Sequence, residues 1–200
     1  MPLPRAFYAR PTLVVARELI GKVLVHRSRG GVTSGIIVEV EAYIGESDPA
    51  CHAAPGPTKR NAPMYGPPGH AYVYLNYGVH PLVNVVTEPE RSPAAVLIRA
   101  LEPLEGLALM RRRRMRPRTA RRRKAAPIPD HALCRGPGNL THAMGITLKD
   151  TGIDLLGGKL YIEDRGQRVE TIEWSRRIGI NVAVEREWRC YASGHPSVSG

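Results

Sequence analysis

The feature that most constrains this chain is the period-two alternation of residues 36–44, which opens the stretch IIVEVEAYIGESDPACH. Apolar and polar residues alternate as they do on a β-strand, where successive side chains point to opposite faces. The polar face carries Glu39, Glu41 and Tyr43, and the run then breaks into a polar loop that ends on His52. Such a face is typical of the solvent side of an antiparallel strand. It also suits a strand that lines a site, and the rest of the chain decides between these two interpretations.

Length and composition favour one domain in a reducing compartment. Two hundred residues with 42% hydrophobic content can fill a single core. No apolar run is long enough to cross a bilayer, and the start has no apolar segment of the secretory type, so we expect a cytoplasmic protein. The cysteines Cys51, Cys134 and Cys190 are odd in number and widely spaced, which argues against a disulfide framework. No paired-cysteine or paired-histidine motif is present, and we expect neither a metal nor a cofactor.

The charge of the chain points to a polyanionic partner. The formal net charge is +11, and 24 arginines stand against 5 lysines. A basic surface attracts nucleic acids or anionic membranes, and the planar guanidinium group grips phosphate in bidentate fashion. A high-GC genome would also raise the arginine content without a functional cause. The composition therefore favours nucleic acid without identifying it.

Periodicity and turn residues predict an alternation of strands and helices. Helices are expected at residues 11–20, within 102–114 and within 135–146, where Asn139 is the expected N-cap. Strands are expected at residues 22–28, 32–43, 70–75, 79–86 and 94–103, with further short strands in the last third. Residues 45–69, rich in Pro and Gly, read as a long irregular loop, and such loops in compact domains are usually functional or disordered.

Two local features stand out from this pattern. Asn76, Tyr77 and Gly78 predict a tight hairpin, with Tyr77 exposed at its tip, and Pro81 demotes the second strand to an edge or marks a bulge. Ten basic residues crowd positions 111–124, where we expect the end of a helix and a mobile loop. This run is either a phosphate-binding loop or a solvated surface.

Four motifs follow one another along the chain: EVEAYIGESDPACH, AYVYLNYGVHPLVNVV, VLIRALEPLEGL and LCRGPGNLTHAMGI. In this order and spacing they resemble the alkyladenine (3-methyladenine) DNA glycosylase family over nearly the whole chain. The resemblance implies one α+β domain over residues 1–200, with a mixed, mostly antiparallel curved sheet flanked by helices and a protruding hairpin that inserts into DNA. It also implies base-excision repair, in which alkylated or deaminated purines are flipped out of the duplex and their N-glycosidic bonds are hydrolysed.

The resemblance places the catalytic role on Glu41, whose carboxylate would activate a water and stabilise the positive charge that develops on the sugar. Glu39 matches a second acidic position, for which a solvent-facing or arginine-paired carboxylate is at least as good an interpretation. One carboxylate suffices for alkylated purines, which are already cationic, whereas neutral hypoxanthine needs a proton from a source that the sequence does not locate. No lysine occurs in the EAY or YVY motifs, so we expect a monofunctional enzyme that leaves an abasic site.

The resemblance also implies a pocket for the flipped base. Its residues are Tyr43, His52, Tyr74, Asn84 and Arg99. The two tyrosines match a stacking pair, the histidine also hydrogen-bonds the base, and the amide of Asn84 can crowd the exocyclic amine of guanine. Taken without the resemblance, the favoured interpretation of each tyrosine is an amphipathic core residue and that of His52 an ordinary loop histidine, while Asn84 could simply bond its own backbone.

The same comparison implies how the duplex is held. Tyr77 matches the residue that enters the gap left by the flipped nucleotide, although Asn76 and the His80-Pro81 pair alter the surroundings of the hairpin tip. Contacts with the DNA backbone are expected from Arg60, Arg111, Arg112 and Arg113. The expected partner is double-stranded DNA that contains damaged purines, bound by a monomer in a bacterial nucleoid.

Two alternatives remain open at this point. A basic module that binds RNA or DNA without catalysis fits the charge, but not the acidic and aromatic strand. LCRGPGNLTHAMGI could also form a helix–hairpin–helix element of an unrelated repair enzyme, which binds phosphates through glycine amides. The sequence ranks none of the lesions 3-methyladenine, 7-methylguanine, hypoxanthine and ethenoadenine.

Overall fold

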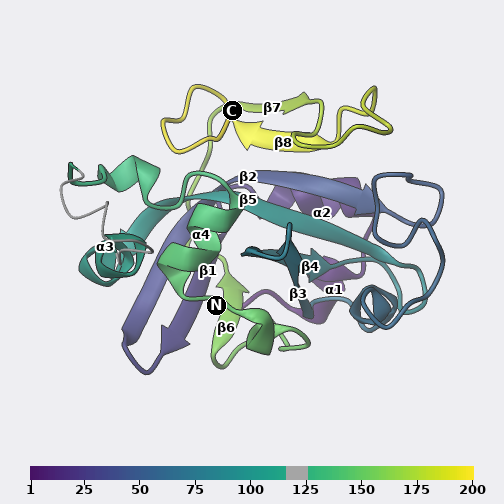
Figure 1. Cartoon of the computed structure of the whole chain (residues 1–200), viewed down its shortest axis with the longest axis horizontal. Coiled ribbons are helices and arrows are strands. Elements are labelled where there is room, and N and C mark those ends of the chain that lie inside the picture. Colours follow the sequence, from purple (N-terminus) through teal and green to yellow (C-terminus); the bar gives the residue numbers. More distant parts are fainter. Residues whose placement is uncertain (116–125) are drawn as a thin grey trace.

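The computed structural model describes residues 1–115 and 126–200, which form a single α+β domain around a curled sheet (Figure 1). The strands are β1 (Val23–Ser28), β2 (Gly31–Ile44), β3 (Ala71–Asn76), β4 (His80–Val86), β5 (Ala94–Glu105), β6 (Leu160–Glu163), β7 (Ile172–Ser175) and β8 (Arg189–Ala192). They follow the order β3-β4-β5-β2-β1-β6, while β8 pairs with β2 and with β7. The α+β prediction is confirmed. The pairings of the described strands are all antiparallel, so the sheet is more uniform than the mixed sheet that was expected.

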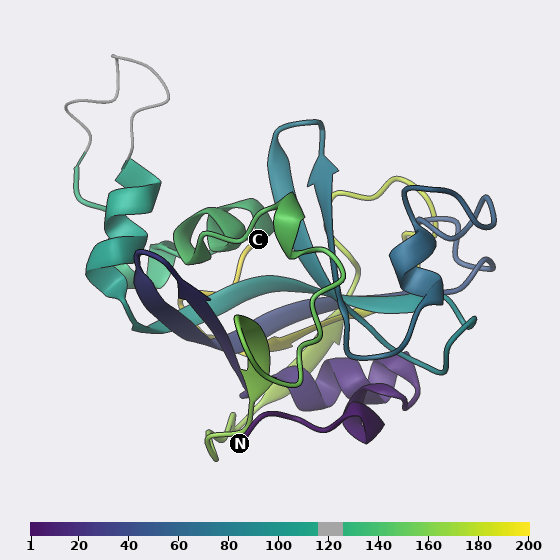
Figure 2. The same ribbon diagram turned by 90° about the horizontal axis from the view of Figure 1, so that it is seen from below.

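Helices cover the sheet on both sides, as Figure 2 shows, with α1 and α2 below it and α4 above it beside the hairpin. The helices are α1 (Arg5–Tyr8), α2 (Thr12–Leu19), α3 (Leu107–Met115) and α4 (Pro137–Met144), with the single 3-10 turns η1 (Ala62–Tyr65), η3 (Asp130–Ala132) and η4 (Leu148–Asp150). The main core joins apolar side chains of α2, α3 and α4 to those of the sheet. Its largest fully buried members include Leu19, Ile37, Ile98, Leu101, Met110, Leu140 and Met144. No helix in the described ranges is long and apolar enough to span a membrane.

The start of α4 corrects two predictions. Asn139 is not the N-cap, because Gly136 takes that place with φ 89°, a left-handed conformation that glycine adopts readily. Asn139 lies inside the first turn, and its Nδ2 donates to the carbonyl of Arg135 at 2.7 Å. The element before α4 is the single turn η3 and not a helix, so this part of the described chain is no helix–hairpin–helix.

Strands β3 and β4 form the predicted tight hairpin, which projects from the sheet (Figure 2). Tyr77 and Gly78 take positive φ values of 49° and 67° at its tip. Only residues 84–86 of β4 pair with β5, so Pro81 lies in the half of the strand that has one neighbour, as an edge position requires. The hydroxyl of Thr141 on α4 donates to the carbonyl of Pro81 at 2.6 Å and thereby ties the hairpin to the helix.

The arginine run begins as part of α3, which ends at Met115. The mobile loop predicted for the remainder of the run lies outside the described residues. Arg113 donates from Nη1 to the carbonyls of Ala143 and Met144 at 2.9 and 2.6 Å, and from Nη2 to the Ser28 hydroxyl at 2.8 Å. These carbonyls belong to the last turn of α4, where helix oxygens lack helical partners and a cation is stabilising. Arg113 therefore closes the end of α4.

We predict that Arg113→Ala lowers the free energy of unfolding by about 1–3 kcal/mol, because it removes charged hydrogen bonds from half-buried carbonyls. Urea denaturation measures this change. Arg112→Ala is the matched control on the same helix, since its side chain is exposed, and we expect a change within about 0.5 kcal/mol. Equal losses in the two variants would refute the capping role of Arg113.

Candidate active site

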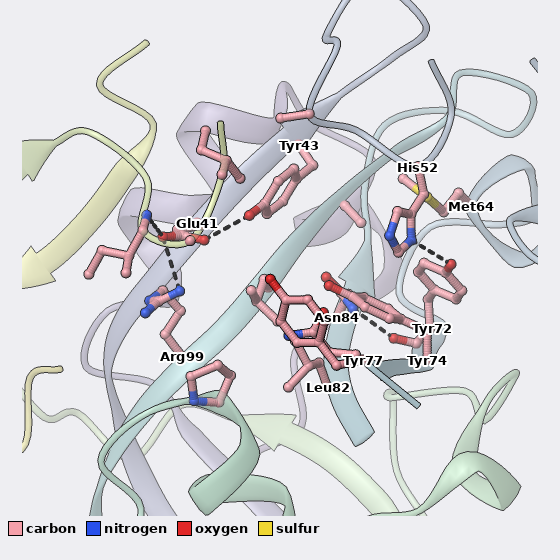
Figure 3. A pocket seen from close by; sticks show the side chains of 18 residues that line it. Glu41, Tyr43, His52, Met64, Tyr72, Tyr74, Tyr77, Leu82, Asn84 and Arg99 are labelled. Atoms are coloured by element: carbon pink, nitrogen blue, oxygen red, sulfur yellow. Dashed lines mark hydrogen bonds and ion pairs between the residues drawn. The ribbon is translucent and has the colours of Figure 1, made fainter. Parts of the chain in front are cut away.

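A cavity of about 230 Å³ lies between β2, the β3–β4 hairpin, β5 and residues 178–180 (Figure 3). The residues predicted for catalysis, base binding and intercalation all line it. They are Glu41, Tyr43, His52, Tyr74, Tyr77, Asn84 and Arg99. They come from β2, the loop that follows it, the β3–β4 hairpin and β5, so the fold gathers in one place what the sequence distributes over almost sixty positions.

Glu41 is fully buried, and three donors hold its carboxylate. The backbone N–H of Ile178 donates to Oε1 at 2.7 Å, and the Nη1 of Arg99 lies 3.1 Å from the same oxygen. The Tyr43 hydroxyl donates to Oε2 at 2.8 Å. Burial and the neighbouring Glu41 charge raise the pKa of Tyr43 far above its ordinary value, so this phenol remains a donor. The carboxylate is therefore fixed in place and faces the cavity as an acceptor.

Glu39 lies beside this site but does not line the cavity. It is fully buried, which shows that the solvent-facing interpretation of this strand face was wrong and the arginine-paired one correct. Its Oε1 lies 2.8 Å from Nε of Arg99 and 2.7 Å from Nε of Arg189. Burial disfavours the charged form, but the two arginines and Ser199 outweigh it, and the pKa of Glu39 is lowered from its ordinary value.

Arg99 reaches both carboxylates from an irregular point of the sheet. The pairs Glu39↔Ala100 and Val40↔Ile98 leave Arg99 as the extra residue of β5, at a register shift between the two strands. Such bulges redirect side chains and often occur next to active sites. Burial lowers the pKa of Arg99, but the negative charges of Glu41 and Glu39 outweigh this effect, and the pKa is raised from its ordinary value.

Aromatic side chains form the opposite wall. The His52 ring lies 4.3 Å from that of Tyr74 between centroids, and its Nδ1 lies 2.9 Å from the hydroxyl of Tyr72. Burial, reinforced by the charge of Arg60, lowers the pKa of His52 and favours the neutral imidazole. Burial raises the pKa of Tyr72 and of Tyr74 to about 12, so both rings keep their hydroxyl protons. The wall is therefore uncharged at neutral pH.

Asn84 is buried and donates from Nδ2 to the carbonyl of Tyr72 at 3.0 Å, which fixes its amide in the lining of the cavity. Arg60 stands outside the cavity, with its guanidinium 5.6 Å from the centre of the Tyr74 ring. Arg111 forms an ion pair with Asp130, and Arg112 is exposed. DNA contacts by Arg60, Arg111, Arg112 and Arg113 stay predictions, and Arg113 also bonds the end of α4.

Sequence reasoning missed several residues of the site. Tyr72 had a signal, because it precedes Tyr74 by two positions on one strand and so shares its face. Residues 178–180 had none, since Ile178 acts through its backbone N–H. Arg177 forms a buried pair with Asp48, with N–O distances of 2.6 and 2.8 Å, and its guanidinium lies 4.7 Å from the centre of the Tyr43 ring. This pair supports the ring from a position that no local pattern indicates.

The arrangement suits a planar guest more than a metal. Aromatic rings on one side and a fixed carboxylate on the other can hold a flat base while presenting an anion to the group attached to it. In the described parts of the chain, no group of three or more His, Cys, Asp or Glu side chains could hold a metal ion.

Comparison with known proteins connects this geometry to a family. The sequence profile of the methylpurine-DNA glycosylase family matches residues 6–196. A relative from Methanocella arvoryzae is 49% identical over 98% of this chain and 95% of its own, and one from Chlorobium phaeobacteroides is 47% identical over 97% and 93%. One from Methanoculleus marisnigri is 46% identical over 100% and 99%. Each carries the provisional name 3-methyladenine DNA glycosylase.

The lowered pKa of Glu39 predicts a pH-dependent contribution to stability. Above the unfolded-state pKa of about 4.3 the ionised carboxylate stabilises the folded chain, and this contribution is lost as the pH falls through the lower folded-state value. We therefore expect Glu39→Gln to lower the free energy of unfolding by about 3 kcal/mol near neutral pH, since it leaves two buried arginines with a weaker partner.

The difference in the free energy of unfolding between wild type and Glu39→Gln should narrow as the pH falls below the unfolded-state pKa of about 4.3, because Glu39 then takes up a proton more readily in the unfolded chain than in the folded one. Urea denaturation across this pH range measures it. Glu170→Gln, a matched change at an exposed glutamate, should leave stability nearly unaltered. A gap that is independent of pH would contradict the assigned role of the Glu39 charge.

Proposed function

Because this chain belongs to the methylpurine-DNA glycosylase family and is a DNA glycosylase, we propose that it flips alkylated or deaminated purines out of duplex DNA and hydrolyses the N-glycosidic bond with a water activated by Glu41. One observation carries this proposal. A fully buried carboxylate with three fixed donors faces a cavity whose other wall is aromatic, next to an exposed tyrosine at a hairpin tip.

Flipping is required because the scissile bond is inaccessible within stacked duplex DNA. Tyr77 is 86% exposed and also borders the cavity, so the ring can fill the gap in the duplex next to the nucleotide that enters. A solvent-exposed aromatic side chain at a projecting tip suits a wedge that inserts through the minor groove. The flipped base would stack between Tyr43 and the wall formed by His52 and Tyr74.

The chemical step would use Glu41 as a general base. Its carboxylate accepts a proton from a water as the water oxygen forms a bond to C1′ of the sugar, and the electrons of the breaking glycosidic bond leave with the purine. The carboxylate also stabilises the positive charge that develops on the sugar. An alkylated, cationic purine leaves as a neutral base and needs no acid, so one carboxylate is enough for it.

The cavity lining supports two finer features of the reaction. No lysine is present among its described residues, so the proposed reaction lacks a Schiff-base nucleophile and ends at an abasic site. Asn84 lines the cavity and is held by the Tyr72 carbonyl, and its amide is proposed to crowd the exocyclic amine of an undamaged guanine. The enzyme would then select its substrate in two ways, by accepting the damaged base and by excluding normal bases.

Binding to the duplex would rest on the excess of positive charge. The net charge of +11 favours association with phosphates, and the proposed backbone contacts are Arg60, Arg111, Arg112 and Arg113. We propose that a monomer binds double-stranded DNA carrying a damaged purine, since one chain supplies the complete set of cavity residues.

We predict that Glu41→Gln lowers the single-turnover release of hypoxanthine from a duplex by about 10²- to 10⁴-fold, the usual effect of losing a general base. The amide keeps the size and much of the hydrogen bonding, so binding of a duplex with an abasic analogue should persist. Glu39→Gln is the matched control on the same strand and should lose far less activity. Near-normal turnover in Glu41→Gln, or an equal loss in Glu39→Gln, would refute the assignment.

A second prediction concerns the hairpin tip. Tyr77→Ala should weaken the flipped state and slow excision from a paired duplex, while lesions that flip easily, such as mispaired ones, retain more activity. Single-turnover rates on matched and mispaired lesions measure the difference. If Tyr77→Ala leaves duplex excision untouched while Tyr74→Ala abolishes it, the tip is not the wedge.

A further inference from the structure

We propose that Ser199 is a positioning residue for base release, which fixes the guanidinium of Arg99 and through it the carboxylate of Glu41. The proposal rests on the proposed role of Glu41. It gives a specific role to the C-terminal segment, to which the family resemblance assigned no site residue. No residue of this segment is among the described residues that line the cavity.

Each nitrogen of the Arg99 guanidinium has a different partner. Nε donates to Oε1 of Glu39 at 2.8 Å, and Nη1 lies 3.1 Å from Oε1 of Glu41. Nη2 donates to the hydroxyl of Ser199 at 3.2 Å. Two contacts define an axis about which a planar group can still tilt, and a third contact off that axis fixes the plane. Ser199 supplies this third contact, and the guanidinium that it fixes belongs to Arg99, which is only 6% exposed.

Ser199 can fill this role because its own position is fixed. Its backbone N–H donates to Oε2 of Glu39 at 2.7 Å, and its hydroxyl lies 3.0 Å from Oε1 of the same carboxylate. A hydroxyl can donate once and also accept, so it can donate to Glu39 while accepting from Arg99. The carbonyl of Ser199 accepts from Nη2 of Arg189 at 2.6 Å, and the carbonyl of Val198 accepts from Nε of Arg135 at 2.8 Å.

The consequence for catalysis follows from geometry. Without the hydroxyl, Nη2 loses its partner in a nearly water-free setting, and the guanidinium can tilt about the line from Glu39 to Glu41. Nη1 then holds the carboxylate of Glu41 less closely, and the carboxylate gains freedom relative to the water and the sugar. Misplacing a reacting group by ~1 Å can cost about 100-fold in rate. The shift expected here is smaller.

The test compares three variants in single-turnover release of hypoxanthine from a duplex. Ser199→Ala should slow release by about 10-fold, a fraction of the loss that a ~1 Å displacement causes, while binding of an abasic-analogue duplex stays unchanged. Ser199→Thr keeps the hydroxyl and should restore the rate. Ser197→Ala makes the same change two positions away, at a buried hydroxyl that has no hydrogen-bond partner among the described residues, and should leave the rate unaltered.

Equal rates in Ser199→Ala and Ser197→Ala, or a failure of Ser199→Thr to restore the rate, would overturn the proposal. If Ser199→Ala does not fold, Ser199→Cys replaces it, and the weaker hydrogen bonding of its thiol should give an intermediate rate; a wild-type rate in that variant would overturn the proposal as well.

A second measurement tests the role of Ser199 without depending on base release. In ¹⁵N-labelled protein, the Nη–H signals of Arg99 should be resolved in the wild type, because its guanidinium is held against rotation. They should merge or broaden in Ser199→Ala and stay resolved in Ser197→Ala. A wild-type protein that releases no base would refute the proposed function, and unchanged Arg99 signals in Ser199→Ala would refute the role of Ser199 whatever the activity.

Discussion

The placement of two carboxylates inside the protein is the constraint on which the rest of the structure depends. Glu39 and Glu41 are fully buried on one strand, and a buried carboxylate without partners is strongly unfavourable. Each is therefore surrounded by donors from distant segments: Arg99 on β5, Arg189 on β8, Ser199 near the C-terminus and the N–H of Ile178. The same contacts join these segments around β2. Stability and the proposed chemistry thus share one network, in which one carboxylate holds the arginines and the other faces the cavity.

The sequence predicted the parts of this arrangement that depend on local pattern. Alternation around Glu41 gave the long strand and the shared face, the turn residues near Tyr77 gave the hairpin, and Pro11 with Gly21 bounded the helix that became α2. The residues that the motifs assign to the base pocket all line one cavity, while their roles stay predictions. The burial of the strand face could not be predicted, because the segments that cover it lie more than a hundred positions downstream. Backbone donors such as Ile178 leave no pattern in side chains. The prediction of Asn139 as the N-cap was wrong because the helix begins three positions earlier, where Gly136 takes the capping place with a positive φ that asparagine adopts less readily.

The long irregular loop shows how a segment without regular structure can present a residue accurately. Asn61 is buried, and its amide donates to the carbonyls of His52 and Gly56 at 2.7 and 2.9 Å, while its oxygen accepts from the N–H of Thr58. This single side chain replaces the backbone ladder that a strand or helix would provide. At the other end of the loop, the buried pair of Asp48 and Arg177 connects the loop to the segment that covers Glu41. The histidine is thus set by polar contacts inside its own loop, before any guest enters the cavity.

The tip of the hairpin has an evolutionary consequence. Tyr77 holds a left-handed backbone conformation that costs a non-glycine residue of order 1 kcal/mol, and its ring is left almost entirely in water. Glycine at this position would relax the backbone, and a small polar residue would remove an exposed apolar surface. Selection for the stability or solubility of the free protein therefore acts against the tyrosine at this position. If the ring is the wedge, only selection for repair retains it, and stabilised variants of this protein should be obtained most readily at the expense of the residue that meets the DNA.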